Sequence, residues 1–383
     1  MIRVAFTMIG GKKWVGGYNY LLNLLRVITR FQHGEIHPVL FLGTDIDADD
    51  LTSFRSISGV EIITSPLMNK KRSSVSLIKS LLFGADLSIK QMFNKHNIDV
   101  IFENARFFGK NIGIPTIAWI PDLQHRELPD LFSWVAWWKR ELGFRVQIAN
   151  RKSIMLSSND ARDSFERYYP KAIGRSHVVK FAVLLTNIPT LTEITKIRKL
   201  YGLPKRYFYM PNQFWQHKNH LLSIEALDII QKKYSDIVIL ASGKQIDPNK
   251  PQHFQHILSL LKEKNLHNQF RLLSLIPYEH IAPIMLGSVA VLNPSLFEGW
   301  STTVEEARAL GVPMILSDIP VHIEQAYGIA TFFNPHSAKS FANTLEKAWQ
   351  KENKDTIIES NDGHAKEFAR NFAKIAKNTA ING

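Results

Sequence analysis

The amino-acid sequence predicts an α/β protein with two Rossmann-like domains, each built on a doubly wound parallel sheet. Its 383 residues are enough for two domains of ordinary size, and a hydrophobic content of 45% is typical of a globular chain. Short apolar runs alternate with helix-length segments along both halves of the chain, which is the pattern of a parallel sheet. Two such arrays predict two domains that face a central cleft, with ligands at the carboxyl ends of the strands.

The predicted strands are short apolar runs bounded by turn residues or by helical segments. In the first half they are residues 2–8, 38–42, 60–64, 99–102, 116–120, 153–156 and 177–181. In the second half they are residues 207–210, 237–241, 270–273, 289–292, 314–316 and 330–333.

These runs place one domain at residues 1–184 and a second at residues 205–364. The stretch between them, 185–204, holds Asn187-Ile188-Pro189-Thr190 and then a charged helix, so we interpret it as the interdomain linker. Residues 365–383 are predicted to form a last amphipathic helix.

Composition excludes several classes of site. The chain has no Cys, which rules out disulfides, thiolate metal sites and a Cys nucleophile, and agrees with a reducing cytoplasm. None of its 14 His residues lies in a His-Glu-x-x-His or similar motif, so we expect no metal. The apolar run at residues 2–8 is too short for a signal peptide, and no run reaches the roughly 18 residues of a membrane span. A cytoplasmic protein is expected.

Positive charge is concentrated in the first half. Residues 1–200 carry a net charge of +11, and residues 201–383 carry +2. One basic cluster runs from Lys70 to Arg72, and residues 131–152 mix Trp and basic residues at helical spacing. This pattern suits a protein that binds peripherally to the anionic inner face of the cytoplasmic membrane. The alternative is a solvated basic face with its Trp rings in the core. The motifs of nucleic-acid binding are missing, so no nucleic-acid partner is expected.

The most informative segment follows the predicted strand at residues 289–292. It reads Pro-Ser-Leu-Phe-Glu-Gly-Trp-Ser-Thr-Thr and opens a helix near Thr302. Unpaired amides at a helix start favour a phosphate, and the hydroxyls of Ser301, Thr302 and Thr303 add donors. Glu298 lies before the helix and Glu306 one turn inside it, so a polyhydroxylated ligand with a central phosphate fits. An ordinary βα turn with an acidic first helical turn is the alternative.

The pattern Glu298-x7-Glu306 within Pro-Ser-x-Phe-Glu-Gly resembles the signature of the retaining family-4 glycosyltransferases, which have the GT-B fold. The resemblance implies that Glu298 holds hydroxyls of the donor sugar and that Glu306 holds the nucleotide ribose. It further implies that the last helix crosses back to the first domain. The residues that it assigns to the diphosphate are Gly299, Trp300, Ser301, Thr302 and Thr303.

A glycine-rich loop, residues 10–17, follows the first predicted strand. Glycines there let the backbone approach a ligand closely. The loop is not Gly-x-Gly-x-x-Gly, which disfavours a dehydrogenase. The resemblance places Gly16 and Gly17 beside the donor phosphate and the acceptor, while a plain tight turn is the alternative.

The segment 210–220 corresponds to the Gly-Arg-x4-Lys segment of family-4 enzymes, whose two cations neutralise the leaving diphosphate. Lys218 matches the lysine, but Gln213 occupies the arginine position and supplies no charge. Lys244, after Gly243, is a candidate substitute for that cation. The amino-acid sequence of this segment resembles that of a subgroup of bacterial polysaccharide and O-antigen glycosyltransferases. The alternative for Lys218 is an ordinary surface lysine beside a helix cap.

In the first half, Asp122 and His125 follow the predicted strand at residues 116–120. Many family-4 members carry His-Asp here, near the acceptor and the reacting carbon. Asp122 matches the aspartate, whereas His125 comes three residues after it and could replace the missing histidine. Either side chain could orient an acceptor hydroxyl or act as a base, and an Asp that caps the following turn is the alternative.

Together these residues predict a metal-independent, retaining glycosyltransferase without a cofactor. It would move a hexosyl or deoxyhexosyl residue from a nucleotide-diphosphate sugar to a hydroxyl of a glycan or lipid-linked acceptor in cell-surface polysaccharide synthesis. The catalytic candidates are Asp122, His125, Lys218 and Glu298. A GT-B scaffold that binds a nucleotide without transferring sugar is one alternative, and a sugar-nucleotide epimerase is another.

Overall fold

The computed structural model describes residues 1–8, 15–104, 106–149, 152–351 and 362–382. It divides into two compact units. The first comprises 1–123, 138–184 and 362–383, and the second comprises 124–137 and 185–361. The units differ from the expected domains at residues 124–137, which group with the second unit, and at residues 362–364, which group with the first.

The first unit contains a parallel sheet with the strand order β3-β2-β1-β4-β5-β6-β7. Its strands are β1 Ile2–Thr7, β2 Ile36–Leu42, β3 Glu61–Thr64, β4 Val100–Glu103, β5 Thr116–Trp119, β6 Ser153–Leu156 and β7 Ser176–Val178. The strand order reverses between β1 and β4, which are hydrogen-bonded neighbours. Such a reversal is the topological switch point at which α/β sheets bind ligands.

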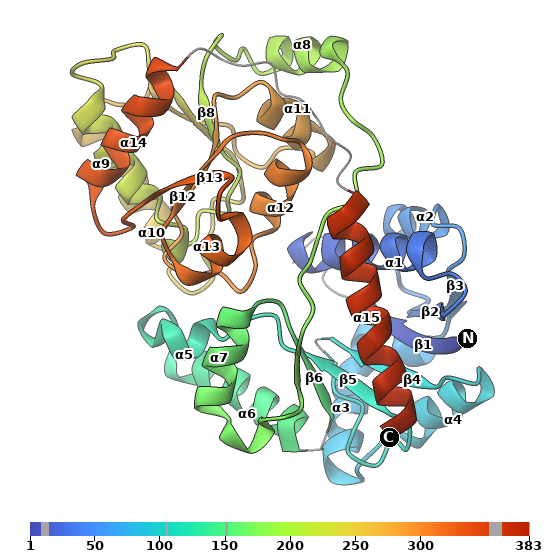
Figure 1. The fold of residues 1–383 in the computed structure, drawn as a ribbon. Coiled ribbons are helices and arrows are strands. Elements are labelled where there is room, and N and C mark those ends of the chain that lie inside the picture. Colours follow the sequence, from blue (N-terminus) through green and yellow to red (C-terminus); the bar gives the residue numbers. More distant parts are fainter. Residues whose placement is uncertain (9–14, 105, 150–151, 352–361, 383) are drawn as a thin grey trace. The chain divides into compact units, whose positions relative to one another are not determined.

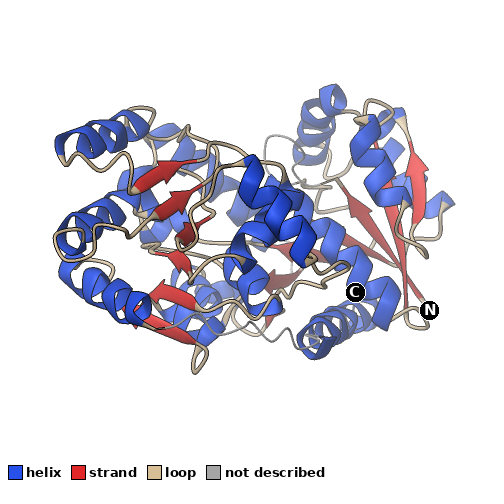
Figure 2. Ribbon diagram, turned by 90° about the horizontal axis from the view of Figure 1, so that it is seen from above, coloured by secondary structure: helices blue, strands red, loops and turns tan. Residues whose placement is uncertain are grey.

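The helices of the first unit flank this sheet (Figure 2). They are α1 Val15–Phe31, α2 Ala48–Arg55, α3 Lys70–Leu82, α4 Leu87–Lys95, α6 Trp134–Ala149 (from Trp138 onward), α7 Asn159–Tyr168 and α15 Asp362–Asn382. The last of these, α15, packs against α1 and against β1, β4 and β5 (Figure 1). Phe372 of α15 is fully buried, with its ring 5.7 Å from that of Phe6 and 5.6 Å from that of Phe102.

The second unit repeats the architecture with the strand order β10-β9-β8-β11-β12-β13, again all parallel. Its strands are β8 Phe208–Met210, β9 Ile239–Ala241, β10 Phe270–Leu272, β11 Val291–Asn293, β12 Met314–Ser317 and β13 Ala330–Phe333. Here the order reverses between β8 and β11. The loops that follow these two strands are therefore the expected ligand-binding loops.

Alternating side chains of the second sheet enter two separate hydrophobic cores, because successive residues of a strand point to opposite faces. Phe208 and Met210 belong to one core, and Tyr207 and Tyr209 belong to the other. The helices of this unit are α5 Gln124–Glu127, α8 Leu191–Leu200, α9 His220–Ile230, α10 His253–Glu263, α11 Ile281–Leu286, α12 Thr302–Ala309, α13 Pro320–Ala326 and α14 Ala338–Gln350. Two parallel-sheet α/β units are thus present, as the alternation of the sequence predicts.

The packing of α15 against the first sheet can be tested by substituting Phe372. Phe372→Ala is expected to lower the free energy of unfolding by about 3 to 5 kcal/mol, because it opens a cavity between two core rings. The measurement is urea unfolding followed by circular dichroism. Ile381→Ala, which truncates a side chain of the same helix that is 80% exposed, should leave stability unchanged. Equal stability of the two variants would contradict the docking.

Candidate functional site

The candidate site is built on the two loops that leave the switch point of the second sheet. The loop after β8 passes through a short 3-10 helix, Gln216–Lys218, into α9. Asn219 joins the two helices with a left-handed backbone, φ 59°, a conformation that Asn adopts more readily than most residues. Its side-chain amide donates to the carbonyl of Pro335 at 2.9 Å. This junction fixes the position of Lys218.

Lys218 forms an ion pair with Glu298 from the loop after β11. The Nζ to Oε1 distance is 2.5 Å, and the side chains are only 12% and 9% exposed. The Ser295 hydroxyl donates to the same Glu298 oxygen at 2.7 Å. The switch point therefore joins a cation and a carboxylate whose residues are 80 positions apart in the sequence.

The charges around Glu298 keep it ionised. Burial by itself raises the pKa of a carboxyl group, but the positive charge of Lys218 outweighs burial here. The hydrogen bond from Lys218 acts in the same direction, and the pKa falls to about 2. At neutral pH, Glu298 can therefore only accept hydrogen bonds.

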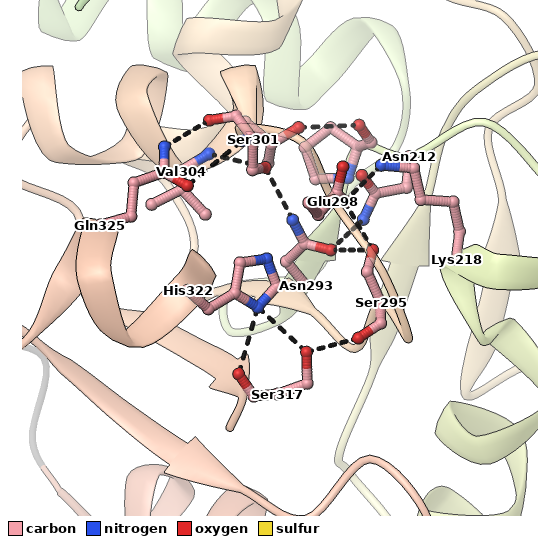
Figure 3. Close-up of polar contacts among 12 residues, drawn as sticks. Asn212, Lys218, Asn293, Ser295, Glu298, Ser301, Val304, Ser317, His322 and Gln325 are labelled. Atoms are coloured by element: carbon pink, nitrogen blue, oxygen red, sulfur yellow. Dashed lines mark hydrogen bonds and ion pairs between the residues drawn. The ribbon is translucent and has the colours of Figure 1, made fainter. Parts of the chain in front are cut away.

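A buried polar network lies around the pair (Figure 3). Asn293 is the last residue of β11. Its Oδ1 lies 2.6 Å from the Ser295 hydroxyl oxygen, and its amide nitrogen donates to Ser301 Oγ at 2.8 Å. Asn212, from the loop after β8, donates to Asn293 Oδ1 at 3.4 Å. The network ties the loops after β8 and β11 to the start of α12.

The start of α12 is held by side chains as well as by backbone. Ser301 is its N-cap residue, and its Oγ accepts from the Val304 amide at 3.4 Å. The Gln325 side chain from α13 contacts the backbone of Ser301 twice: its Nε2 donates to the Ser301 carbonyl at 2.8 Å, and its Oε1 accepts from the Ser301 amide at 3.2 Å. Ser301 is 3% exposed, so its hydroxyl acts as a cap.

The other residues assigned to the diphosphate surround this cap. Thr303 is buried, and its hydroxyl lies 3.5 Å from the Pro211 carbonyl. Gly299, Trp300 and Thr302 are partly exposed. The first-turn amides of α12 have no acceptor within their own helix, so this helix start favours an anion.

His322 is linked through Ser317 to the loop after β11, and the sequence did not identify it. Its Nδ1 lies 3.0 Å from Ser317 Oγ and 3.1 Å from the Ser317 carbonyl, and Ser317 Oγ donates to the Ser295 carbonyl at 2.6 Å. Burial lowers the pKa of His322 to about 4, so its ring is neutral at pH 7. His-x-x-Gln in an amphipathic segment carries no signal that would identify either His322 or Gln325.

Glu306 lies one turn into α12 and is partly exposed. Its Oε1 accepts from the Tyr278 hydroxyl at 2.7 Å. Burial raises the pKa of Glu306 to about 7, and the hydrogen bond from Tyr278 offsets only part of this effect. The two carboxylates of the motif therefore differ: Glu298 stays ionised, and Glu306 titrates near neutral pH.

Gln213 makes a contact that an arginine would change. Its Oε1 accepts from the backbone amide of Lys244 at 3.1 Å, and the Phe214 amide donates to the Lys244 carbonyl at 3.1 Å. A Cβ on Gly243 would lie 2.3 Å from the Asn212 carbonyl oxygen, which requires glycine there. The Lys244 side chain is exposed. Gln213 thus connects the loops after β8 and β9.

Of the candidates from the first half of the chain, Asp122, Gly16 and Gly17 belong to the first unit, whereas His125 groups with the second unit. Asp122, in the first unit, forms a close ion pair with Arg140, and both side chains are 27% exposed. His125 is buried, with its ring 5.7 Å from that of Trp137. Gly16 and Gly17 lie in the first turn of α1. Residues 10–14 of the glycine-rich loop lie outside the described residues.

Within the described part of the chain, no group of three or more acidic or His side chains could hold a metal ion. The same residues include no helix that is long and apolar enough to cross a membrane.

The chain resembles known glycosyltransferases in sequence. Residues 193–364 match the family model described as glycosyl transferases group 1. A curated relative, the O-antigen chain mannosyltransferase RfbU of Salmonella typhimurium, is 21% identical over 206 residues. That match covers 54% of this chain and 53% of the relative, about half of each. The expected resemblance to the group 1 glycosyltransferases is thereby confirmed for the second half of the chain.

Solved structures resemble the whole chain. A glycosyltransferase from Rickettsia africae has a TM-score of 0.66 at 15% identity, and 100% of this chain and 93% of that chain are covered. Anabaena HepE, in complex with UDP and glucose, has a TM-score of 0.66 at 16% identity, with 99% and 95% covered. WaaG, a glycosyltransferase involved in lipopolysaccharide biosynthesis, has 0.63 at 12% identity, with 100% and 96% covered. The likeness confirms the GT-B fold.

The buried ion pair predicts a large effect of Lys218→Met on stability. The free energy of unfolding at pH 7 is expected to fall by about 3 kcal/mol, because Glu298 is left buried without its cation. The deficit should shrink as the pH falls toward 4, because the unpaired carboxyl group can then take up a proton. Urea unfolding at both pH values measures this.

Lys233→Met is the matched control, since Lys233 also pairs with a glutamate at 2.5 Å but is 65% exposed. It should change stability little at either pH. A loss in Lys218→Met no larger than in the control would contradict the structural importance of the buried pair.

Substitution of Glu306 is expected to have the opposite effect on stability: a gain that grows as the pH rises. Its pKa in the folded protein, about 7, lies above its ordinary value of 4.5, so ionisation costs the folded state stability as the pH rises between these values. Glu306→Gln should therefore match the wild type at pH 4.5 and exceed it at pH 8. The difference is on the order of 1 to 2 kcal/mol, because water screens the partly exposed carboxylate. Glu279→Gln, on the exposed turn beside Tyr278, should show no such difference.

Proposed function

We propose that this chain is a retaining glycosyltransferase that acts without a metal. It transfers a hexosyl or deoxyhexosyl residue from a nucleotide-diphosphate sugar to a hydroxyl group of a glycan or lipid-linked acceptor in cell-surface polysaccharide synthesis. The observation that carries the proposal is the Lys218–Glu298 pair at the switch point of the second sheet, next to the start of α12.

The electrostatics suit a sugar diphosphate. The helix start and Lys218 together favour an anionic group, and Glu298 beside them accepts hydroxyl hydrogens. In the absence of donor, the two side chains satisfy each other. Entry of the donor would exchange that pair for two new contacts, Lys218 with a phosphate oxygen and Glu298 with the sugar hydroxyls. Each side chain would then keep a partner of opposite polarity, which limits the cost of desolvation.

Glu306 suits the nucleotide side of the donor. It lies about 6 Å along α12 from the start of the helix, at 1.5 Å per residue, so a group bound there lies one turn away from the phosphate. A carboxyl group that titrates near pH 7 can pair with a ribose diol in either protonation state. This supports the assignment of Glu306 to the ribose.

The charge on Lys218 supports the proposed chemistry. Negative charge develops on the diphosphate as the bond to the anomeric carbon breaks, and a cation already in place stabilises it without reorganisation. The resemblance to the family-4 enzymes supports retention, with attack from the face that the leaving phosphate occupies. Asp122 is the group we propose to orient the acceptor hydroxyl, and His125 is a second candidate for that role.

The similarity to RfbU, an O-antigen chain mannosyltransferase, supports a role in surface polysaccharide synthesis and makes a mannosyl donor the first to test. We place the reaction in the cytoplasm, in agreement with a chain that has no Cys.

Gln213 favours one second candidate, a GT-B scaffold that binds a nucleotide without transferring sugar. Its side chain is bonded to the Lys244 amide and brings no charge to the phosphate site. Donor binding without turnover would select this candidate. An epimerase would instead convert the donor when no acceptor is present.

Donor binding is the first experiment. Thermal shift with UDP-, GDP- and dTDP-sugars is expected to show stabilisation by one nucleotide class, since a ligand that binds only the folded state raises Tm. Glu306→Ala and Lys218→Ala should each abolish that shift, whereas Glu279→Ala and Lys233→Ala should keep it. If Lys218→Ala is too unstable, the double variant Lys218→Met with Glu298→Gln removes both charges together.

Catalysis is then tested with the donor that binds, labelled in its sugar, by measuring transfer of the label to a glycan or lipid-linked acceptor. Lys218→Ala should lower kcat by about 100- to 1,000-fold, the usual loss when a group that stabilises developing negative charge is removed. NMR of the product at the anomeric carbon reports retention or inversion. Inversion would overturn the retaining assignment, and the absence of a shift with every donor would overturn the nucleotide-sugar site.

A further inference from the structure

Helix α3 of the first unit (Figure 1) presents its apolar side chains to solvent. An amphipathic helix of a globular domain normally does the reverse, with its apolar stripe on the core. The exposed apolar side chains and their exposed fractions are Val75 50%, Leu77 42%, Ile78 55%, Leu81 53%, Leu82 72% and Phe83 74%. Leu87, at the start of α4, is 69% exposed and adds to this surface. We refer to these seven residues as the α3 surface.

The face of α3 that packs on the protein is polar. Ser76 and Ser80 are 1% and 2% exposed, and they follow Arg72 at intervals of four residues, so the three side chains share one face. The two hydroxyls and the Arg72 Nε are buried without a hydrogen-bond partner among the described residues. Burying such groups costs free energy, so packing against the domain does not explain why this helix and the Phe83 that follows it carry six apolar side chains.

The flank of the α3 surface is strongly basic. Lys70 and Lys71 are exposed at the start of the helix, Lys79 is partly exposed, and no acidic residue occurs between Glu61 and Asp86. The partner that covers this surface must therefore combine an apolar interior with negative charge at its edge. A second copy of the chain would bring its own lysines against these lysines, and like charges repel.

We propose that α3 lies in the interfacial plane of a membrane that contains anionic lipids. The helix has 13 residues and is about 20 Å long, too short to span a bilayer but suited to lie in its surface. Leu82, Phe83 and their apolar neighbours enter the boundary between headgroups and acyl chains, while the lysine ammonium groups meet lipid phosphates. This assigns a docking surface to the first unit, and it does not depend on the sugar-transfer site.

Flotation with lipid vesicles tests the proposal. The full chain is mixed with vesicles of phosphatidylcholine alone or with about one quarter phosphatidylglycerol. Binding is expected only to the anionic vesicles and should weaken as salt is raised, because surface charges are screened. Lys70→Gln with Lys71→Gln should reduce binding on the order of twentyfold, since each lysine near an anionic surface contributes about fivefold.

The apolar contribution is tested separately. Leu82→Ser with Phe83→Ser removes two exposed side chains and leaves the core intact, and it should abolish flotation at moderate salt. Its matched control is Leu191→Ser with Tyr327→Ser, which removes a leucine and an aromatic ring that are each 83% exposed in the second unit. The control for charge is Lys232→Gln with Lys262→Gln, two exposed lysines of the second unit. Both controls should bind as the wild type does.

Three outcomes would overturn the proposal: no binding to anionic vesicles, equal loss in the variants and their controls, or a stable dimer in solution that the Leu82 and Phe83 changes dissociate. The last outcome would assign the α3 surface to a second copy of the chain. Thermal shift with the nucleotide sugar is run on the same variants. It should be unchanged in all of them, so a failure of membrane binding is distinguishable from a failure of the donor site.

Discussion

The site depends on one constraint: the carboxylate of Glu298 is buried beside the switch point of a parallel sheet and must be compensated there. An isolated buried carboxylate is too costly to remain ionised, and Lys218 at 2.5 Å removes that cost. The pairing holds the loop after β8 against the loop after β11. Because those loops leave adjacent strands at the reversal of strand order, one ion pair sets the geometry at the carboxyl edge of the sheet.

Polar groups extend this constraint outward. Asn293 contacts Ser295, which is bonded to Glu298, and it donates to Ser301. Gln325 holds the backbone of Ser301, so that α12 starts at a fixed place. A neutral His322 supports the same loops without adding charge. The result is a set of dipoles and charges already oriented before any ligand arrives, the arrangement that stabilises developing charge most effectively. Different surroundings divide the two glutamates into a permanent acceptor and a group that titrates near pH 7.

Sequence patterns predicted the two sheets and the loops that carry Lys218 and Glu298. Strand-sized apolar runs with helices between them require parallel sheets, and both sheets have the expected strands. The Lys218 and Glu298 segments could be identified because each carries a motif at the end of a strand. Asn293, His322 and Gln325 could not, since their roles come from hydrogen bonds between loops that are distant in sequence. The sequence placed Ser301 at the start of α12, and the structure adds that its hydroxyl oxygen accepts from the Val304 amide as the helix cap.

The chain by itself thus determined the fold class, the segments that carry charge and the excess of basic residues in its first half. Only the tertiary structure decided which charges meet and which helix face is covered. Lys70 and the apolar residues that follow are plain in the sequence, but whether Ser76 or Leu82 faces the core depends on how α3 packs against the rest of the domain. The physical reason is that sequence periodicity defines two faces of a helix, while burial depends on contacts between elements far apart in the chain.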